Sequence, residues 1–267
     1  MKGRVLVVAG SDSGGGAGIQ ADIKAITALG GYAATAITAL TAQDTLGVHG
    51  VHVVPPAFLR QQMECVLGDI GADAIKIGML ATPETVDLVA DVLVPHAGTP
   101  LVLDPVMVAK GGAPLLAADA VATIKRRLLP LATLITPNLP EAEVLAGMSI
   151  PDETAMRHAA EALLTLGVPA VLLKGGHLSG PVVQDILVSD EGLEVFTSPR
   201  QYTRDTHGTG CTLASAIATG LAQGYTLRDA VRRARAYLQA AIAQAPGYGS
   251  GHGPLNHAVT VDPTRFD

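Results

Sequence analysis

Apolar residues recur along this 267-residue chain in two alternating patterns. Short runs rich in valine, isoleucine and leucine are typical of buried strands, and they cover residues 4–9, 33–40, 74–77, 100–103, 133–135, 170–173, 183–189 and 193–198. Longer amphipathic stretches are typical of helices, and they cover residues 19–29, 56–67, 83–93, 120–128, 141–146, 153–166, 209–223 and 227–244. This alternation predicts parallel strands joined by crossover helices.

The pattern as a whole predicts one layered α/β domain. Seven or so buried strands with helices on both faces would form a three-layer α/β/α sandwich around a mostly parallel sheet. The last two strand-like runs are separated by Asp190-Glu191-Gly192, which is a hairpin signal. No Pro/Gly/Ser-rich linker, internal repeat or low-complexity tract divides the sequence, so we expect residues 1–267 to form a single domain.

Composition and charge narrow the class of protein. With 48% hydrophobic and 16% charged residues, the chain has the opposite balance from a disordered protein. Its net charge of −6, without a basic cluster, argues against nucleic acid as a partner. The uncharged stretches 25–43 and 206–227 contain turn residues, so neither predicts a membrane span. Two cysteines and no signal-peptide cleavage site predict a cytoplasmic protein.

A glycine-rich segment, residues 10–18, lies between the first strand and the first helix. Glycines let the backbone approach a ligand closely, and a helix N-terminus offers free N–H groups. The segment is not a dinucleotide fingerprint, because the third glycine of a motif starting at Gly14 would fall on Ile19. It also lacks a Gly-Lys-Ser/Thr ending. We interpret it as a ligand-contacting loop, with a flexible turn as the alternative.

Four polar residues follow predicted strands, where ligands bind at the edge of an open parallel sheet. Asp104 would face that edge or cap a turn. Asn138 and Glu141 could hold water on a magnesium ion, and they also have the spacing of a capping box. Lys174 precedes two glycines and could meet a phosphate, although most lysines are solvated surface residues.

The sharpest signal is a turn that opens an apolar helix. A Gly-x-Gly turn at a helix N-terminus exposes N–H groups at the positive end of the helix dipole, which favours an anion. The turn consists of Gly208, Thr209, Gly210 and Cys211. A cysteine there is expected to have a lowered thiol pKa if it is partly exposed. The alternative is a buried cysteine that packs as a small hydrophobic residue.

Together these segments resemble the ribokinase-like superfamily and, within it, the hydroxymethylpyrimidine/phosphomethylpyrimidine kinases of thiamine biosynthesis. The matching segments keep the order of the family along the whole chain, and they are residues 9–12, 17–22, 38–43, 76–80, 103–110, 135–142, 174–177, 205–212 and 251–254. The resemblance implies a ribokinase-like α/β fold and a small-molecule kinase that uses ATP.

The resemblance also implies a substrate pocket. In it Gln43 would hydrogen-bond the aminopyrimidine, and the remaining contacts would come from Gly10, Asp22, Met79, Val106 and Cys211. Asp44 stands beside Gln43 where asparagine is common in the family, which leaves the fine substrate preference open. His207 is interpreted as structural or as adjacent to phosphate, because the histidines show no metal-ligand spacing.

For the nucleotide, the resemblance implies that Asp104, Asn138 and Glu141 organise Mg–ATP, with magnesium held through water. It implies that Lys174 contacts phosphate and that the turn from Gly208 to Cys211 binds the transferring phosphoryl group. A homodimer is also implied, while a requirement for potassium stays open.

Two phosphorylations would follow one another in this site. In the first an alcohol attacks, and a thiolate at Cys211 could accept its proton. In the second the nucleophile is already an anionic phosphate and needs no base. The nearest alternative is a pyridoxal or pyridoxine kinase, including a dual activity, and a more distant one is a non-catalytic pyrimidine sensor on the same fold.

Overall fold

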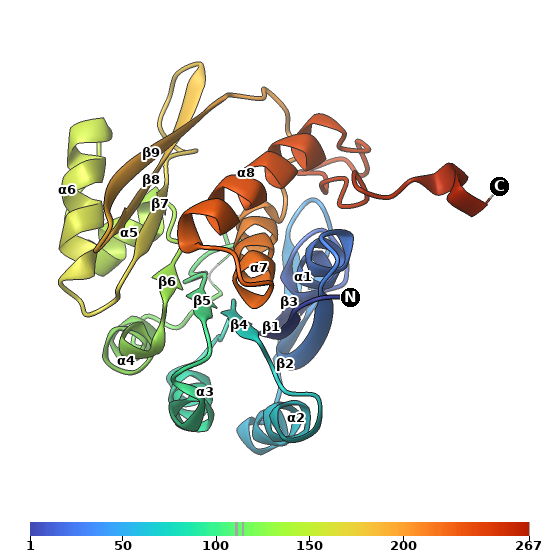
Figure 1. The fold of residues 1–267 in the computed structure, drawn as a ribbon, viewed down its shortest axis with the longest axis vertical. Coiled ribbons are helices and arrows are strands. Elements are labelled where there is room, and N and C mark those ends of the chain that lie inside the picture. The colour runs from blue at the N-terminus through green and yellow to red at the C-terminus, as the bar shows by residue number, and fades with distance from the viewer. Residues whose placement is uncertain (110–111, 114, 267) are drawn as a thin grey trace.

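Strands and helices alternate along the chain in the computed structural model, which describes residues 1–109, 112–113 and 115–266 (Figure 1). Lys110, the last residue of the motif 103–110, lies outside the described residues. The α-helices are α1 Gly18–Ala28, α2 Pro56–Asp69, α3 Pro83–Leu93, α4 Ala120–Arg127, α5 Leu139–Ala146, α6 Glu153–Leu164, α7 Thr209–Ala222 and α8 Leu227–Ala243. The strands are β1 Arg4–Asp12, β2 Tyr32–Gln43, β3 Val48–Val53, β4 Ala74–Ile77, β5 Leu101–Leu103, β6 Leu134–Ile135, β7 Val171–Lys174, β8 Val182–Ser189 and β9 Gly192–Pro199.

All of these strands join one sheet, in the order β3-β2-β1-β4-β5-β6-β7-β8-β9. The central strands from β2 to β7 pair in parallel, while β3 at one edge and β8 and β9 at the other pair antiparallel. The predicted mostly parallel α/β architecture is therefore confirmed, and so is the hairpin between the last two strands.

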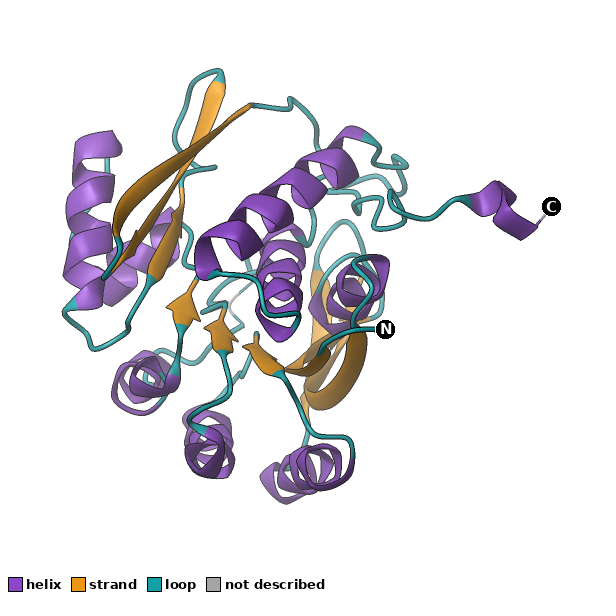
Figure 2. Cartoon of the chain, viewed as in Figure 1, coloured by secondary structure: helices purple, strands orange, loops and turns teal. Residues whose placement is uncertain are grey.

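Helices cover both faces of the sheet (Figure 2). Side chains alternate across a strand, so Val5 and Val7 of β1 pack with α1, α7 and α8, whereas Leu6 and Val8 pack with the helices α2 to α6. Figure 1 shows these two groups of helices on opposite sides of the strands. Because both faces are buried, the central strands read in the sequence as nearly continuous apolar runs.

Two features of the sheet differ from the prediction. The sequence pattern gave no strand at β3, because this antiparallel edge strand is mostly exposed and includes Gly50. Strands β1 and β2 also run further than expected, to Asp12 and Gln43, because Asp12 still pairs with Thr41 of β2 and Gln43 pairs with Val48 of β3. These longer ends carry polar side chains to the edge where the site lies.

The parallel strands β1, β4, β5, β6 and β7 all end at the same edge of the sheet. Ligands of open α/β sheets bind beyond the carboxyl ends of such strands. No helix in the described part of the chain is both long and apolar enough to cross a bilayer.

Candidate active site

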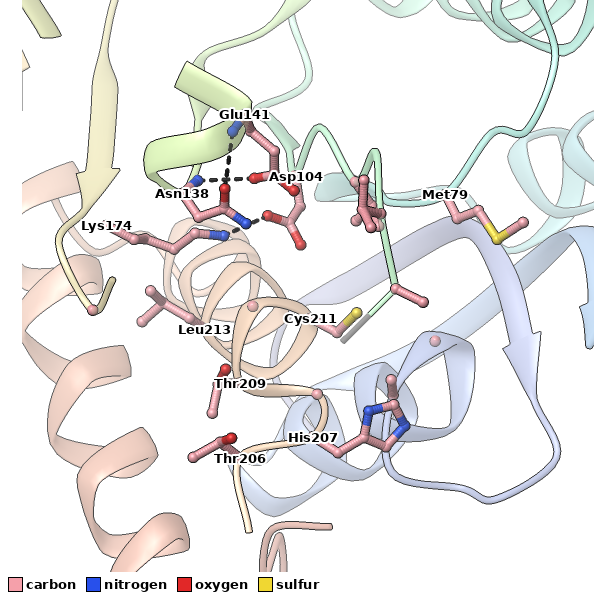
Figure 3. A pocket seen from close by; sticks show the side chains of 18 of the residues that line it. Met79, Asp104, Asn138, Glu141, Lys174, Thr206, His207, Thr209, Cys211 and Leu213 are labelled. Atoms are coloured by element: carbon pink, nitrogen blue, oxygen red, sulfur yellow. Dashed lines mark hydrogen bonds and ion pairs between the residues drawn. The ribbon is translucent and has the colours of Figure 1, made fainter. Parts of the chain in front are cut away.

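A cavity of about 720 Å³ lies at the carboxyl edge of the sheet. It brings together the predicted site residues from segments far apart in the sequence, and those that line it are Gly10, Gln43, Met79, Asp104, Val106, Asn138, Glu141, Lys174, Gly208, Thr209, Gly210 and Cys211. Figure 3 labels Met79, Asp104, Asn138, Glu141, Lys174, Thr209 and Cys211 around the cavity. Asp22 is placed differently. It is completely buried behind the cavity wall, where its carboxylate is bonded to Lys76. Any effect of Asp22 on a ligand would therefore be transmitted by Lys76.

Asp104 and Lys174 form an ion pair at one end of the cavity. Lys174 Nζ lies 2.9 Å from Asp104 Oδ1, and the hydroxyl of Thr136 donates to the same oxygen at 2.9 Å. Burial alone would raise the pKa of Asp104, but the ammonium groups of Lys174 and Lys76 outweigh burial and hold it below the usual value. Asp104 is therefore an anion that faces the cavity beside a fixed cation.

Asn138 and Glu141 form the capping box at the start of α5. The Asn138 N–H donates to Glu141 Oε2 at 2.8 Å, and the Glu141 N–H donates to Asn138 Oδ1 at 3.0 Å. Burial raises the pKa of Glu141 to about 7, with Lys174 opposing the rise and Asp104 adding to it. The capping interpretation is therefore confirmed, and both side chains also line the cavity.

Oxygen atoms of Asp104, Asn138 and Glu141 are the hard ligands that magnesium prefers. In the described residues, no cluster of three or more His, Cys, Asp or Glu side chains is arranged to bind a metal directly. Asp104 and Glu141 are neighbouring carboxyl groups, and the pKa of Glu141 is raised. A divalent cation nearby would stabilise the ionised form of both groups. This donor set fits a hydrated magnesium ion.

The turn at the start of α7 lies against the Asp104–Lys174 pair. A methyl group built on Gly210 would be 3.3 Å from both Asp104 Oδ2 and Lys174 Nζ. Gly208 has a φ of +82°, and a methyl group there would overlap the carbonyl oxygen of Gly16. The two glycine-rich segments therefore meet backbone to backbone, with the positive end of α7 directed at the ion pair.

Cys211 corrects one sequence-based expectation. Burial raises the pKa of its thiol to about 11, although the Lys76 ammonium and the Gly18 N–H both act to lower it. The prediction of a lowered pKa was wrong, because desolvation of the thiolate, together with the nearby carboxylates of Asp22 and Asp104, outweighs the Lys76 ammonium and the Gly18 N–H. Cys211 is therefore a neutral thiol in the resting protein.

The opposite end of the cavity is less charged. Met79 and Gly10 lie together there, since a methyl group on Gly10 would be 3.0 Å from the Met79 sulfur. Thr38 fixes the backbone by donating to the Met79 carbonyl at 2.6 Å. The amide of Gln43 lies near Thr41 at 3.1 Å and near the ring of His207 at 3.3 Å. An apolar slot with one oriented amide suits a polar heteroaromatic ring.

Sequence reasoning gave Asp12 no role, although it organises the first loop. Its carboxylate accepts the N–H groups of Gly14 and Ala17, each at 2.8 Å, and lies 2.8 Å from His207 Nε2. Burial opposes ionisation of Asp12, but the bond to His207 leads the contacts that keep its pKa below the usual value. His207 thereby joins the loop to the turn before α7, and its side chain also lines the cavity. The aspartate that opens the glycine-rich segment was the available signal.

Comparison with known proteins agrees with this geometry. The family model for phosphomethylpyrimidine kinases matches residues 12–256. The chain belongs to this family. Its identification from sequence motifs is therefore confirmed, as is its assignment to a phosphotransferase class.

Two curated relatives show how far the likeness extends. The chain is 47% identical over 258 residues to the hydroxymethylpyrimidine/phosphomethylpyrimidine kinase of Haemophilus influenzae, which covers 95% of this chain and 96% of that protein. It is 54% identical over 264 residues to the thiamine biosynthesis bifunctional protein ThiED of Geobacter sulfurreducens, covering 99% of this chain and 54% of that protein. The chain thus spans about half the length of the Geobacter protein.

Solved structures of related kinases share the fold. Bacillus subtilis pyridoxal kinase, in an ADP complex, matches with a TM-score of 0.90 at 34% identity and covers 97% of this chain and 98% of its own. A phosphomethylpyrimidine kinase from Clostridium difficile matches with a TM-score of 0.80 at 42% identity, covering 89% and 98%. The predicted ribokinase-like fold class is confirmed.

Proposed function

We propose that this protein uses ATP to phosphorylate 4-amino-5-hydroxymethyl-2-methylpyrimidine and then phosphorylates the monophosphate to the pyrophosphate, in thiamine biosynthesis. The observation that carries the proposal is the order of groups along one cavity. Met79 lies on one side, Lys174 with Asp104 lies on the other, and Cys211 of α7 lies between them (Figure 3). In this order the cavity would hold the pyrimidine ring beside Met79, the hydroxymethyl arm beside Cys211 and the nucleotide phosphates beside Lys174.

At the ring end, Gln43 would hydrogen-bond the aminopyrimidine while Gly10, Met79 and Val106 pack against it. Gly10 has no side chain, and one would collide with Met79, so the ring can approach the backbone of β1 closely. Asp22 would support this pocket indirectly, through its bond to Lys76.

At the phosphate end, positioning and charge neutralisation do the chemical work, because phosphoryl transfer passes through a loose transition state. Lys174 would hold phosphate oxygens with its ammonium. The N–H groups of the turn from Gly208 through Thr209 and Gly210 to Cys211 would receive the transferring group at the positive end of α7.

Magnesium, carried in with ATP, would supply charge neutralisation on the phosphates. Asp104, Asn138 and Glu141 would hold it through water, since all three residues line the cavity.

Cys211 would accept the hydroxyl proton in the first step only. The second nucleophile is an anionic phosphate, and a neutral thiol beside it adds no charge repulsion. The raised pKa of the thiol, about 11, therefore suits the second step and limits the first.

A second candidate is a pyridoxal kinase activity, alone or alongside the first. It is favoured by the likeness to the pyridoxal kinases of Bacillus subtilis and of Staphylococcus aureus, one of the latter solved with pyridoxal. Pyridoxal also presents a hydroxymethyl arm on a six-membered ring. A non-catalytic sensor is disfavoured, because the charged groups at the phosphate end would have no task in it.

The wider setting is also proposed. Residues 1–267 would act as one kinase domain in the cytoplasm, as a homodimer, without nucleic acid or a membrane as partner. Light scattering of the purified chain tests the dimer.

Turnover of Mg–ATP with the hydroxymethylpyrimidine, its monophosphate and pyridoxal tests the function, with the products identified by mass. We expect conversion of both pyrimidines. Turnover of pyridoxal alone would move the activity to the second candidate, and no turnover of any of the three would refute a kinase.

A further inference from the structure

Lys76 is a charged residue in the middle of an apolar strand. It is the third residue of β4, between Ile75 and Ile77, and its side chain is completely buried. Burying an ammonium group is expensive unless it is paired, and an apolar residue of similar size often stabilises a protein more. The position of this charge therefore calls for a reason beyond packing.

The alternation of side chains along a strand determines which face of the sheet carries Lys76. Ile75 and Ile77 face the helices α2 to α6, so Lys76 faces the other side, toward α1 and α7. There its Nζ lies 2.9 Å from each oxygen of Asp22 on α1. Ser215 on α7 donates to Asp22 Oδ1 at 2.7 Å. The Asp22 carboxylate therefore fixes the position of the Lys76 ammonium, and Ser215 in turn fixes the position of that carboxylate.

The same helix carries Cys211. Cys211 and Ser215 are four residues apart on α7, so they lie one above the other on the same helix face. Lys76 and Cys211 also line the same cavity, whereas Asp22 does not reach it. A methyl group on Gly78 would be 2.8 Å from Lys76 Nζ, so the absence of a side chain at Gly78 leaves room for the ammonium beneath the cavity.

We propose that Lys76 is a positioning residue for the first phosphorylation: its ammonium, fixed by Asp22 and Ser215, is the buried positive charge that allows Cys211 to take the proton of the substrate hydroxyl. This proposal rests on the proposed two-step function. It assigns Asp22 to the orientation of Lys76 rather than to contact with the substrate.

The step balances as follows. The hydroxymethyl oxygen forms a bond to the γ-phosphorus while the bond from that phosphorus to the bridging oxygen of ADP breaks, and ADP leaves with the electron pair. The hydroxyl proton moves to the sulfur of Cys211, which enters the step as the thiolate and leaves it as the thiol. The population of thiolate limits the step, and Lys76 sets that population.

Charges from several elements act on Cys211, and their signs differ. Lys76 on β4 and Lys174 on β7 favour the thiolate, while Asp22 on α1 and Asp104 after β5 disfavour it. Among these groups Lys76 has the largest effect on the pKa of Cys211, larger than that of Asp22. Removing the charge of Lys76 should therefore lower the thiolate population of Cys211, whereas removing the charge of Asp22 should raise it.

Alkylation of Cys211 measures that population without substrate or nucleotide. In a Cys65→Ser background, which removes the exposed second thiol, iodoacetamide should react at a rate proportional to the thiolate fraction. At pH 8 we expect Lys76→Met to slow the reaction about tenfold, equivalent to about one unit of pKa, and Asp22→Asn to accelerate it several-fold. Damage to packing alone would push both variants in the same direction, and that result would overturn the proposal.

A matched control separates the charge from the loss of any buried ion pair. Arg235 and Asp185 form another buried pair, at 2.8 Å, and Arg235→Met in the same background should leave the alkylation rate unchanged within about twofold. If Lys76→Met does not fold, Asp22→Asn decides alone, because an unchanged or lowered rate there contradicts the proposal.

The two phosphorylations give the second readout. Lys76→Met should lower kcat of the first step by about tenfold, the factor by which the thiolate population falls, and change the second step by less than about threefold. Equal losses in both steps would refute the role. If the parent protein phosphorylates neither pyrimidine, the proposed function fails, while the alkylation series still tests the link between Lys76 and Cys211.

Discussion

The two ends of the cavity are built from the same sheet edge by different means. At the ring end, contacts come from backbone and neutral side chains, such as Gly10, Met79 and the amide of Gln43. At the phosphate end, Asp104, Lys174 and the start of α7 concentrate charge. A neutral end can change its ring preference without disturbing phosphoryl transfer, which agrees with related kinases that act on different rings.

The largest effect that separates the two ends is expected from Lys174→Met. If Lys174 holds the phosphates as we propose, loss of its preorganised ammonium should lower kcat/KM about 100- to 1,000-fold for both pyrimidine steps. The ratio of activities on pyrimidine and pyridoxal should stay constant, because the ring end is untouched. Steady-state kinetics on the three substrates measure both quantities, and a changed ratio would show that the ends are not independent.

The phosphate end should also make stability depend on pH. The pKa of Glu141 is raised from 4.5 to about 7 in the folded protein, so the folded state binds this proton more tightly than the unfolded chain. Its contribution is fully present below pH 4.5 and is lost as pH rises to 7, an effect of about 3 kcal/mol. Urea unfolding of the nucleotide-free protein and of Glu141→Gln should reveal this slope in the parent only. An identical slope in both would contradict the assignment.

The close contact between the glycine-rich loop and the turn before α7 can be tested by comparing two glycines that have similar backbone conformations but different surroundings. Gly208 and Gly224 have φ values of +82° and +85°, but a methyl group at Gly208 would meet the Gly16 backbone while one at Gly224 would meet nothing within 4 Å. Both alanine variants should lose about 1 kcal/mol from backbone conformation. Gly208→Ala should lose a further 1–3 kcal/mol, roughly, from overpacking. Equal free energies of unfolding would show that the two loops separate easily.

The smallest effect is expected at the ring end. Gln43→Ala would remove the hydrogen bond that we propose to the ring, so KM for the pyrimidine should rise about tenfold. KM for ATP should not change, because the amide lies near Thr41 and His207, away from Lys174. An increase in both KM values would show that the ring end and the phosphate end do not bind their ligands independently.

Much of the fold was predictable because buried parallel strands and amphipathic helices leave a periodic signal. The pattern failed at β3, whose exposed edge position requires no apolar run. The site residues after β5, β6 and β7 were predictable for a related reason, since a polar residue directly after an apolar strand must lie at the ligand edge.

The sequence by itself determined the parallel architecture, the glycine turns and the family, because spacing and residue type suffice for these. Only the tertiary structure decided the electrostatics. The turn at Cys211 predicted a lowered pKa, and burial raised it instead. Lys76 and Asp22 are 54 residues apart in the sequence, and only the packing of α1 on β4 makes them a pair beneath that thiol. Desolvation and charge pairing depend on distances in space, which a linear pattern does not contain.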